Sequence, residues 1–237
     1  TEEPNPVSKY RWIEYIIKFS EPVTGFEQSD IYIINGEIMD KGQQFKKISD
    51  TEYTISVKSE DAFMYGALNI KVIVNENAVV DEAGNGNEYA ESEELLIDLV
   101  GPSINLYPSS NQNWKQSQSI EIEIFENGDI GLGGDFFVPP PNELKSGLAL
   151  GAQLQYAWST SETEEPTQWT TLNVAEYEEG TESTTATVIA SGLNGKYYLW
   201  VKPINVKDLA GNSVTDTRKS GEFWFDNIRP TMTITGQ

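Results

Sequence analysis

The chemistry open to this chain is the chemistry of oxygen ligands. Its 237 residues include no Cys and no His. Disulfides, thiolate nucleophiles and thiolate metal sites are therefore excluded, and so are imidazole metal sites and Ser-His-Asp triads. What remains is 37 Asp and Glu side chains, and the metal ions that suit carboxylate and amide oxygens are hard cations such as calcium.

Two copies of one acidic loop are the main candidates for a cation site. Asp81-Glu82-Ala83-Gly84-Asn85 recurs as Asp208-Leu209-Ala210-Gly211-Asn212. One interpretation is a tight turn, because Asp and Asn bond their own backbone and Gly accepts a positive φ. The other is a calcium site, in which each loop meets an Asp that lies further along the same half of the chain.

The calcium interpretation names three side chains in each half. The predicted ligands are Asp81, Asn85 and Asp98 in the first half, and Asp208, Asn212 and Asp226 in the second. Calcium takes about six to eight oxygens, so carbonyl groups and water must complete each shell. The spacing does not match an EF-hand, and the turn and the calcium site both remain open.

Catalysis is not predicted. A glycosidase needs only two carboxylates at a defined separation, and with 37 acids some pair falls within range by chance. No motif selects one such pair, so we expect a protein that is not an enzyme and requires no cofactor beyond the calcium considered above.

The elements that must position these loops are short β-strands. Apolar and polar residues alternate in short runs, which puts one face of each strand inward and the other in water. Turn residues such as Asn35-Gly36 separate the runs, and no long helical period appears. The pattern predicts antiparallel sheets in β-sandwiches. The predicted strands are 12–19, 31–34, 52–57, 68–74, 120–124, 154–158, 185–189 and 197–201.

An internal repeat indicates two modules laid head to tail. Each acidic loop is followed 17 or 18 residues later by an Asp, and four residues after that by a Pro, which gives Asp98 with Pro102 and Asp226 with Pro230. A strand-like run follows each Pro. The predicted modules are residues 1–98 and 99–226, and residues 227–237 are predicted to be the start of a following module or a C-terminal strand.

The second predicted module carries a Gly- and Pro-rich insert near residues 126–153. A loop of this length is either functional or mobile. Phe136 and Phe137 lie in it, and aromatic rings on such a loop suit a sugar face or a protein partner. They are the candidate ligand-binding residues, although the insert can equally fold back and bury them.

The motifs resemble those of bacterial immunoglobulin-like domains, the tandem repeats of large surface and adhesin proteins. In the first half the resemblance covers nearly all of residues 10–98, and a related immunoglobulin-like type is similar to the second half. The residues that carry it are Phe19–Phe26, Asp30, Asn35-Gly36, Tyr53-Thr54, Asp81–Asn85, Tyr156–Ser159, Pro166, Trp169-Thr170, Gly195, Tyr197–Lys202 and Asp208–Asn212. The resemblance implies a stalk or adhesin repeat, in some cases calcium-dependent.

Strand alternation also places particular side chains. Trp158 and Trp200 fall in alternating strands, where a core Trp is ordinary for such a sandwich. Lys18 and Lys71 fall among outward-facing positions. Some surface domains similar to these carry lysine isopeptide crosslinks in the core, and the outward lysines predict none here.

The net charge of −21 limits the classes of partner that this chain is expected to bind. Such a field repels nucleic acid and anionic lipid, and no apolar run is long enough to enter a membrane. We expect an extracellular or bacterial cell-surface monomer whose partners are neighbouring immunoglobulin-like modules of the same chain. Its expected role is a non-catalytic stalk, spacer and adhesion region, with calcium rigidifying it; the alternative is a module that binds a host glycan or protein through the 126–153 insert.

Overall fold

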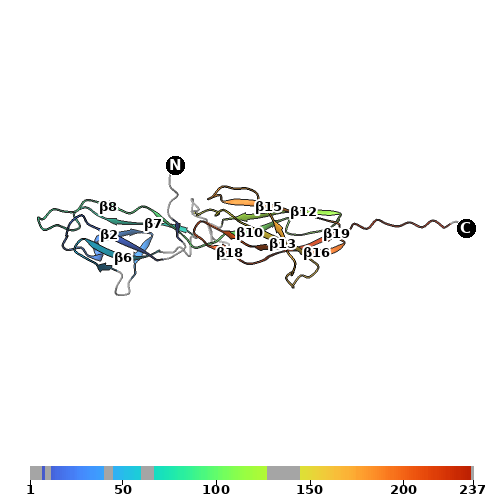
Figure 1. The fold of residues 1–237 in the computed structure, drawn as a ribbon, viewed down its shortest axis with the longest axis horizontal. Coiled ribbons are helices and arrows are strands. Elements are labelled where there is room, and N and C mark those ends of the chain that lie inside the picture. Colours follow the sequence, from blue (N-terminus) through green and yellow to red (C-terminus); the bar gives the residue numbers. More distant parts are fainter. Residues whose placement is uncertain (1–6, 9–11, 40–44, 60–66, 127–144, 236–237) are drawn as a thin grey trace, which may run out of the picture. The chain divides into compact units, whose positions relative to one another are not determined.

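The computed structural model describes residues 7–8, 12–39, 45–59, 67–126 and 145–235. Nearly all regular structure in these ranges is β-strand, and their one helical element is the short 3-10 turn η1 (Gln28–Asp30). None of the described helical structure is long and apolar enough to cross a membrane. The predicted all-β class is confirmed (Figure 1).

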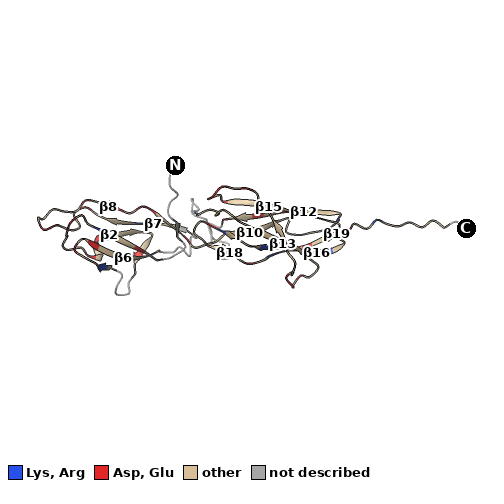
Figure 2. Ribbon diagram, viewed as in Figure 1, with Lys and Arg blue, Asp and Glu red and all other residues tan. Residues whose placement is uncertain are grey.

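The chain divides into two compact units. The first is built on residues up to Val100, together with residues 145–146 and the short stretch Ala210–Asn212. The second contains Gly101–Glu126, Gly147–Leu209 and residues 213–235. Acidic residues occur in both units (Figure 2).

The first unit has two sheets. One has the strand order β1-β9-β7-β3 with β8 paired to β7, and the other has the order β2-β6-β4 with β5 paired to β6. All of these pairs are antiparallel except β1 with β9. The strands are β1 (Val7–Ser8), β2 (Trp12–Lys18), β3 (Ile31–Ile34), β4 (Gly36–Ile38), β5 (Phe45–Lys47), β6 (Glu52–Ser59), β7 (Ala67–Val74), β8 (Ala90–Glu91) and β9 (Leu95–Asp98).

Alternation builds the core of the first unit. Every second residue of β6 is buried, beginning with Tyr53, and every second residue of β7 from Ile70 onward is buried as well. Ile55 and Val57 of one sheet meet Ile70 of the other in the same cluster. Burial of this apolar surface, at about 25 cal/mol per Å², is what holds the two sheets together.

The second unit also has two larger sheets. Their orders are β10-β12-β15 and β11-β19-β16-β13-β14, and β17 with β18 forms a small hairpin. Among these described strands, the edge pair β11 and β19 is parallel and the other pairs are antiparallel. The strands are β10 (Ser103–Tyr107), β11 (Asn111–Lys115), β12 (Ser117–Phe125), β13 (Leu154–Ser159), β14 (Thr170–Leu172), β15 (Ser183–Ser191), β16 (Gly195–Pro203), β17 (Val206–Lys207), β18 (Ser213–Val214) and β19 (Arg218–Phe225).

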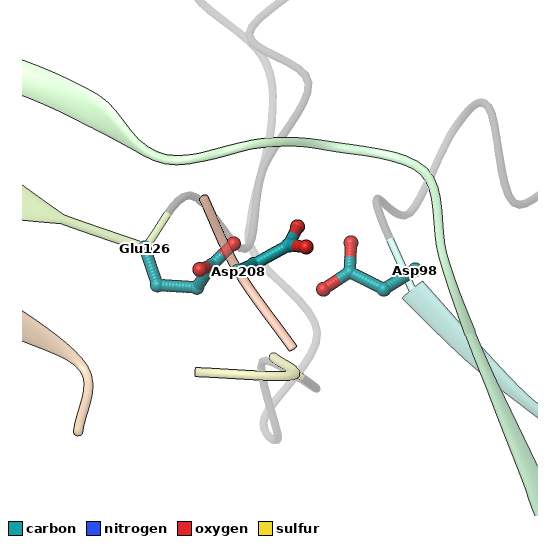
Figure 3. A group of neighbouring side chains, drawn as sticks. All are labelled: Asp98, Glu126 and Asp208. Carbon is teal, nitrogen blue, oxygen red and sulfur yellow. The ribbon is translucent and has the colours of Figure 1, made fainter. Parts of the chain in front are cut away.

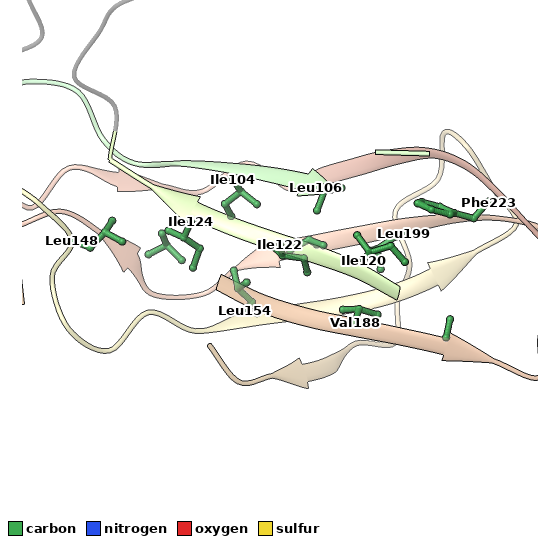
Figure 4. Close-up of a cluster of buried hydrophobic side chains, with 14 of the residues drawn as sticks. Ile104, Leu106, Ile120, Ile122, Ile124, Leu148, Leu154, Val188, Leu199 and Phe223 are labelled. Atoms are coloured by element: carbon green, nitrogen blue, oxygen red, sulfur yellow. The ribbon is translucent and has the colours of Figure 1, made fainter. Parts of the chain in front are cut away.

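The core of the second unit is centred on β12. Ile120, Ile122 and Ile124 point inward with no exposed surface, and they pack with residues of the opposite sheet such as Leu199 and Phe223 (Figure 4). The polar residues between them face outward. Each of the eight strands predicted from alternation is present in the structure, so the period of two was a sufficient signal for them.

The two tryptophans expected in the core lie on opposite faces of their sheet. Trp158 packs edge-on against Phe223 and Phe225, as predicted. Trp200 is buried but does not belong to the core cluster, because its neighbours in β16, Leu199 and Val201, take the inward positions. The burial expected of Trp200 is confirmed, although Trp200 lies on the face of its sheet away from that cluster.

The two strand lysines form ion pairs with acidic residues. Lys18 Nζ lies 3.2 Å from a carboxylate oxygen of Glu52, and Lys71 Nζ lies 3.1 Å from Glu91. Lys71 has a second acidic neighbour, Glu94, at 3.7 Å.

Candidate cation site

The first acidic loop is a self-contained turn. Asp81 Oδ1 accepts a hydrogen bond from the backbone N–H of Asn85 at 2.8 Å, and Oδ2 accepts one from the Asn85 side-chain amide at 2.8 Å. Gly84 takes a φ of 87°, which glycine adopts without strain. The hydrogen bonds, first that from the Asn85 side chain, lower the pKa of Asp81.

Asp81 and Asn85 do not lie with Asp98. Asp98 pairs with Ala67 at the start of β7, whereas Asp81 and Asn85 line a pocket of about 540 Å³ together with Val74, the last residue of that strand. The strand has eight residues, so about 23 Å separates its ends. The predicted grouping of these three residues is wrong because the loop and the closing Asp lie at opposite ends of one sheet.

Asp226 is separated from Asp208 in the same way. Asp226 directly follows Phe225, which pairs with Gly195 at the start of β16, while Asp208 lies beyond Pro203 at the end of that strand. Asp226 is exposed, and its Oδ1 accepts a hydrogen bond from the backbone N–H of Ile228 at 3.0 Å. Its predicted grouping with Asp208 and Asn212 is therefore also wrong.

The Asp98 carboxylate is held by backbone donors. Oδ1 accepts a hydrogen bond from the N–H of Val100 at 3.1 Å, and Oδ2 accepts one from the N–H of Ser146 at 3.0 Å. The Asn212 side-chain amide donates to the backbone carbonyl oxygen of Asp98 at 3.0 Å. Asp98 is thus joined to Asn212, a predicted ligand, although not to the loop that the sequence suggested.

Asp98, Glu126 and Asp208 form one group of buried carboxylates. Each side chain is at most 2% exposed, and one oxygen of each lies within 4.8 Å of the others (Figure 3). This is the one such group of acidic residues among the residues that the structure describes. We refer to these three side chains as the carboxylate group.

Glu126 was not predicted from the sequence, although a signal for it exists. It follows β12 directly, and it continues the inward series of Ile120, Ile122 and Ile124 by one more step of two. A charged residue at the next inward position of a buried strand is unusual, because a buried charge requires a compensating partner. Extending the alternation past the end of the apolar run would have identified it.

A buried serine lies beside the carboxylate group. Ser146 is 8% exposed, its N–H bonds Asp98 Oδ2, and its Oγ has no hydrogen-bond partner among the described residues. A buried hydroxyl without a partner is costly, and it can serve as a further oxygen ligand.

The carboxylate group has the chemistry of a hard cation site. Two oxygens on opposite sides of a calcium ion, each about 2.3–2.6 Å from it, are separated by about 4.6–5.2 Å. The oxygens of the carboxylate group lie no further apart than a calcium ion between them allows. An octahedral magnesium site spans less, about 4.0–4.2 Å, and zinc in proteins favours nitrogen and sulfur ligands of types that this chain does not contain.

Phe136, Phe137 and most of the 126–153 insert lie outside the described residues. The proposed ligand-binding role of the two aromatic residues stays a prediction. Comparison with protein-family models and with curated proteins found no match to this chain.

Proposed function

We propose that this chain is a pair of non-catalytic immunoglobulin-like modules of a bacterial cell-surface or secreted protein, and that it binds calcium at the carboxylate group. Its role is that of a stalk or spacer in an adhesion region. The observation that carries the proposal is the burial of three carboxylates within 4.8 Å of one another.

Electrostatics supports a cation at this position. Two unit negative charges 4.8 Å apart repel each other by about 3–4 kcal/mol at an effective dielectric constant of about 20. Three such pairs oppose folding unless positive charge lies close by. A divalent cation in contact with all three oxygens reverses the sign of the local interaction, because each carboxylate then meets an opposite charge at about half the distance.

The chemistry of the ligands supports calcium in particular. Asp98, Glu126 and Asp208 supply three charged oxygens, Ser146 offers a hydroxyl, and backbone carbonyl groups and water can complete the shell. Two of the three carboxylates, Asp98 and Asp208, belong to the repeated markers from which calcium binding was predicted. The all-β fold and the acidic composition fit a spacer that is exposed to calcium outside the cell.

The test is calcium binding by isothermal titration calorimetry on the full chain after removal of metal with a chelator. We expect one site of high affinity, lost when Asp98 is changed to Asn. Asp226→Asn is the matched control, because Asp226 ends the second half as Asp98 ends the first but lies apart from the carboxylate group. Absence of binding to the wild type, or equal binding by both variants, would reject the proposal.

A further inference from the structure

The segment after Pro230 is extended and has no partner strand among the described residues. Residues 231–235 read Thr-Met-Thr-Ile-Thr, the alternation of a half-buried β-strand. Met232 is 83% exposed and Ile234 is 84% exposed, so the apolar side of the segment faces water. These are the two most exposed large apolar side chains in the described part of the chain.

The internal repeat shows what covers such a segment. Ser103 of β10 lies five residues after Asp98, and Thr231 lies five residues after Asp226, so these two positions correspond. Ile104 then corresponds to Met232, and Leu106 to Ile234. In β10 these two inward positions are 3% and 8% exposed, because β10 pairs antiparallel with β12 over the core of the second unit.

The chain enters both segments through a similar hydrogen bond. The Asp98 carboxylate accepts a hydrogen bond from the N–H two residues on, at 3.1 Å, and the Asp226 carboxylate does the same at 3.0 Å. Asn227 then fixes the exit from the second unit, since its side-chain amide donates to the carbonyl oxygens of Gln116 and Leu193. The hydrogen bond that both Asp residues accept therefore adds to the correspondence in sequence between the two segments.

We infer that residues 231–235 are the first strand of a further β-sandwich. The partner is an antiparallel strand of the β12 kind, with aliphatic residues at every second position facing Met232 and Ile234. Threonine at the three outward positions suits a strand, because β-branched residues favour extended backbone. The inference is independent of calcium, so it stands or falls separately from the proposed function.

The test asks whether this segment works as a first strand inside the second unit of the full chain. In one variant β10 receives the sequence of 231–234, by the changes Ser103→Thr, Ile104→Met, Asn105→Thr and Leu106→Ile. The matched control carries the same four residue types slipped by one position, as Ser103→Met, Ile104→Thr, Asn105→Ile and Leu106→Thr. A slip of one residue turns the apolar side chains to the wrong face of the strand.

We expect the first variant to melt within about 5 °C of the wild type, since its core changes conserve volume, and the slipped variant to melt at least about 10 °C lower. Equal melting of the two variants, or failure of the first variant alone, would overturn the inference. Sedimentation of the wild type at high concentration tests a different occupant. A dimer that Met232→Ser with Ile234→Ser abolishes would assign the segment to a second copy of this chain and likewise overturn the inference.

Discussion

Replacing Glu126 by Gln tests whether the carboxylate group exists to hold a cation. The change keeps the size and shape of the side chain and removes its charge. In the metal-free protein Glu126 faces two carboxylates within 4.8 Å, which amounts to a repulsion of about 7 kcal/mol at an effective dielectric constant of about 20. Loss of the hydrogen bonds that a buried carboxylate accepts opposes the gain, so we expect a net stabilisation of about 1–2 kcal/mol in chelator.

Calcium should make the wild type more stable than Glu126→Gln, the reverse of the order expected in chelator. At a free calcium concentration about 100 times its dissociation constant, a ligand that binds only the folded state stabilises it by about 2.7 kcal/mol. For a unit of this size, each kcal/mol raises the melting temperature by about 3–5 °C, which gives about 10 °C for the wild type. Glu126→Gln lacks one charged ligand and should gain only a small part of that shift.

The assay is a thermal melt of the full chain at pH 7 and constant ionic strength, with chelator, with calcium and with magnesium. The expected result is a crossing: the variant melts higher than the wild type in chelator and lower in calcium. A cation-binding role for Glu126 is refuted if calcium shifts the melting temperatures of both proteins equally or shifts neither. If the variant is less stable by the same amount in both conditions, Glu126 has a structural role alone.

Three further predictions concern the second unit. Ile122→Ala removes a fully buried side chain from the centre of β12 and should lower the free energy of unfolding by about 2–5 kcal/mol, measured by denaturant titration. Gly147→Ala should destabilise the fold by more than about 1 kcal/mol in the same assay, because φ is 82° and a Cβ would meet the carbonyl oxygen of Gly180; a neutral effect would contradict that geometry. The hydrogen bond from Trp224 Nε1, at 2.6 Å, is the main cause that lowers the pKa of Glu222 from its usual 4.5. The folded state thus favours ionised Glu222, so this contribution is complete above pH 4.5 and is lost as the pH falls through the lowered pKa; tryptophan fluorescence should follow that loss, and Glu222→Gln should remove the transition.

The strands were predictable because their signal is local. A period of two in apolar residues fixes which side of a strand is buried, and β12 follows that pattern from Ile120 to Ile124. The repeated Asp-x-Ala-Gly-Asn loop identified Asp208 as a residue of interest, and the Asp that follows the first copy of the loop identified Asp98, since turn chemistry and oxygen ligands are properties of residue type. Which face of a sheet the rest of the chain covers is not a local property, so alternation did not show that Trp200 is buried on the face away from the core cluster.

The sequence by itself thus determined the all-β class, the short strands and the exclusion of thiolate and imidazole chemistry. Only the tertiary structure decided which acidic residues meet. Spacing along the chain suggested that each loop meets the Asp that follows it, but a strand carries its two ends about 23 Å apart, so Asp81 and Asp98 lie at opposite ends of β7. Asp98 instead joins Asp208 and Glu126, because strand direction and length, not distance in sequence, place carboxylates side by side.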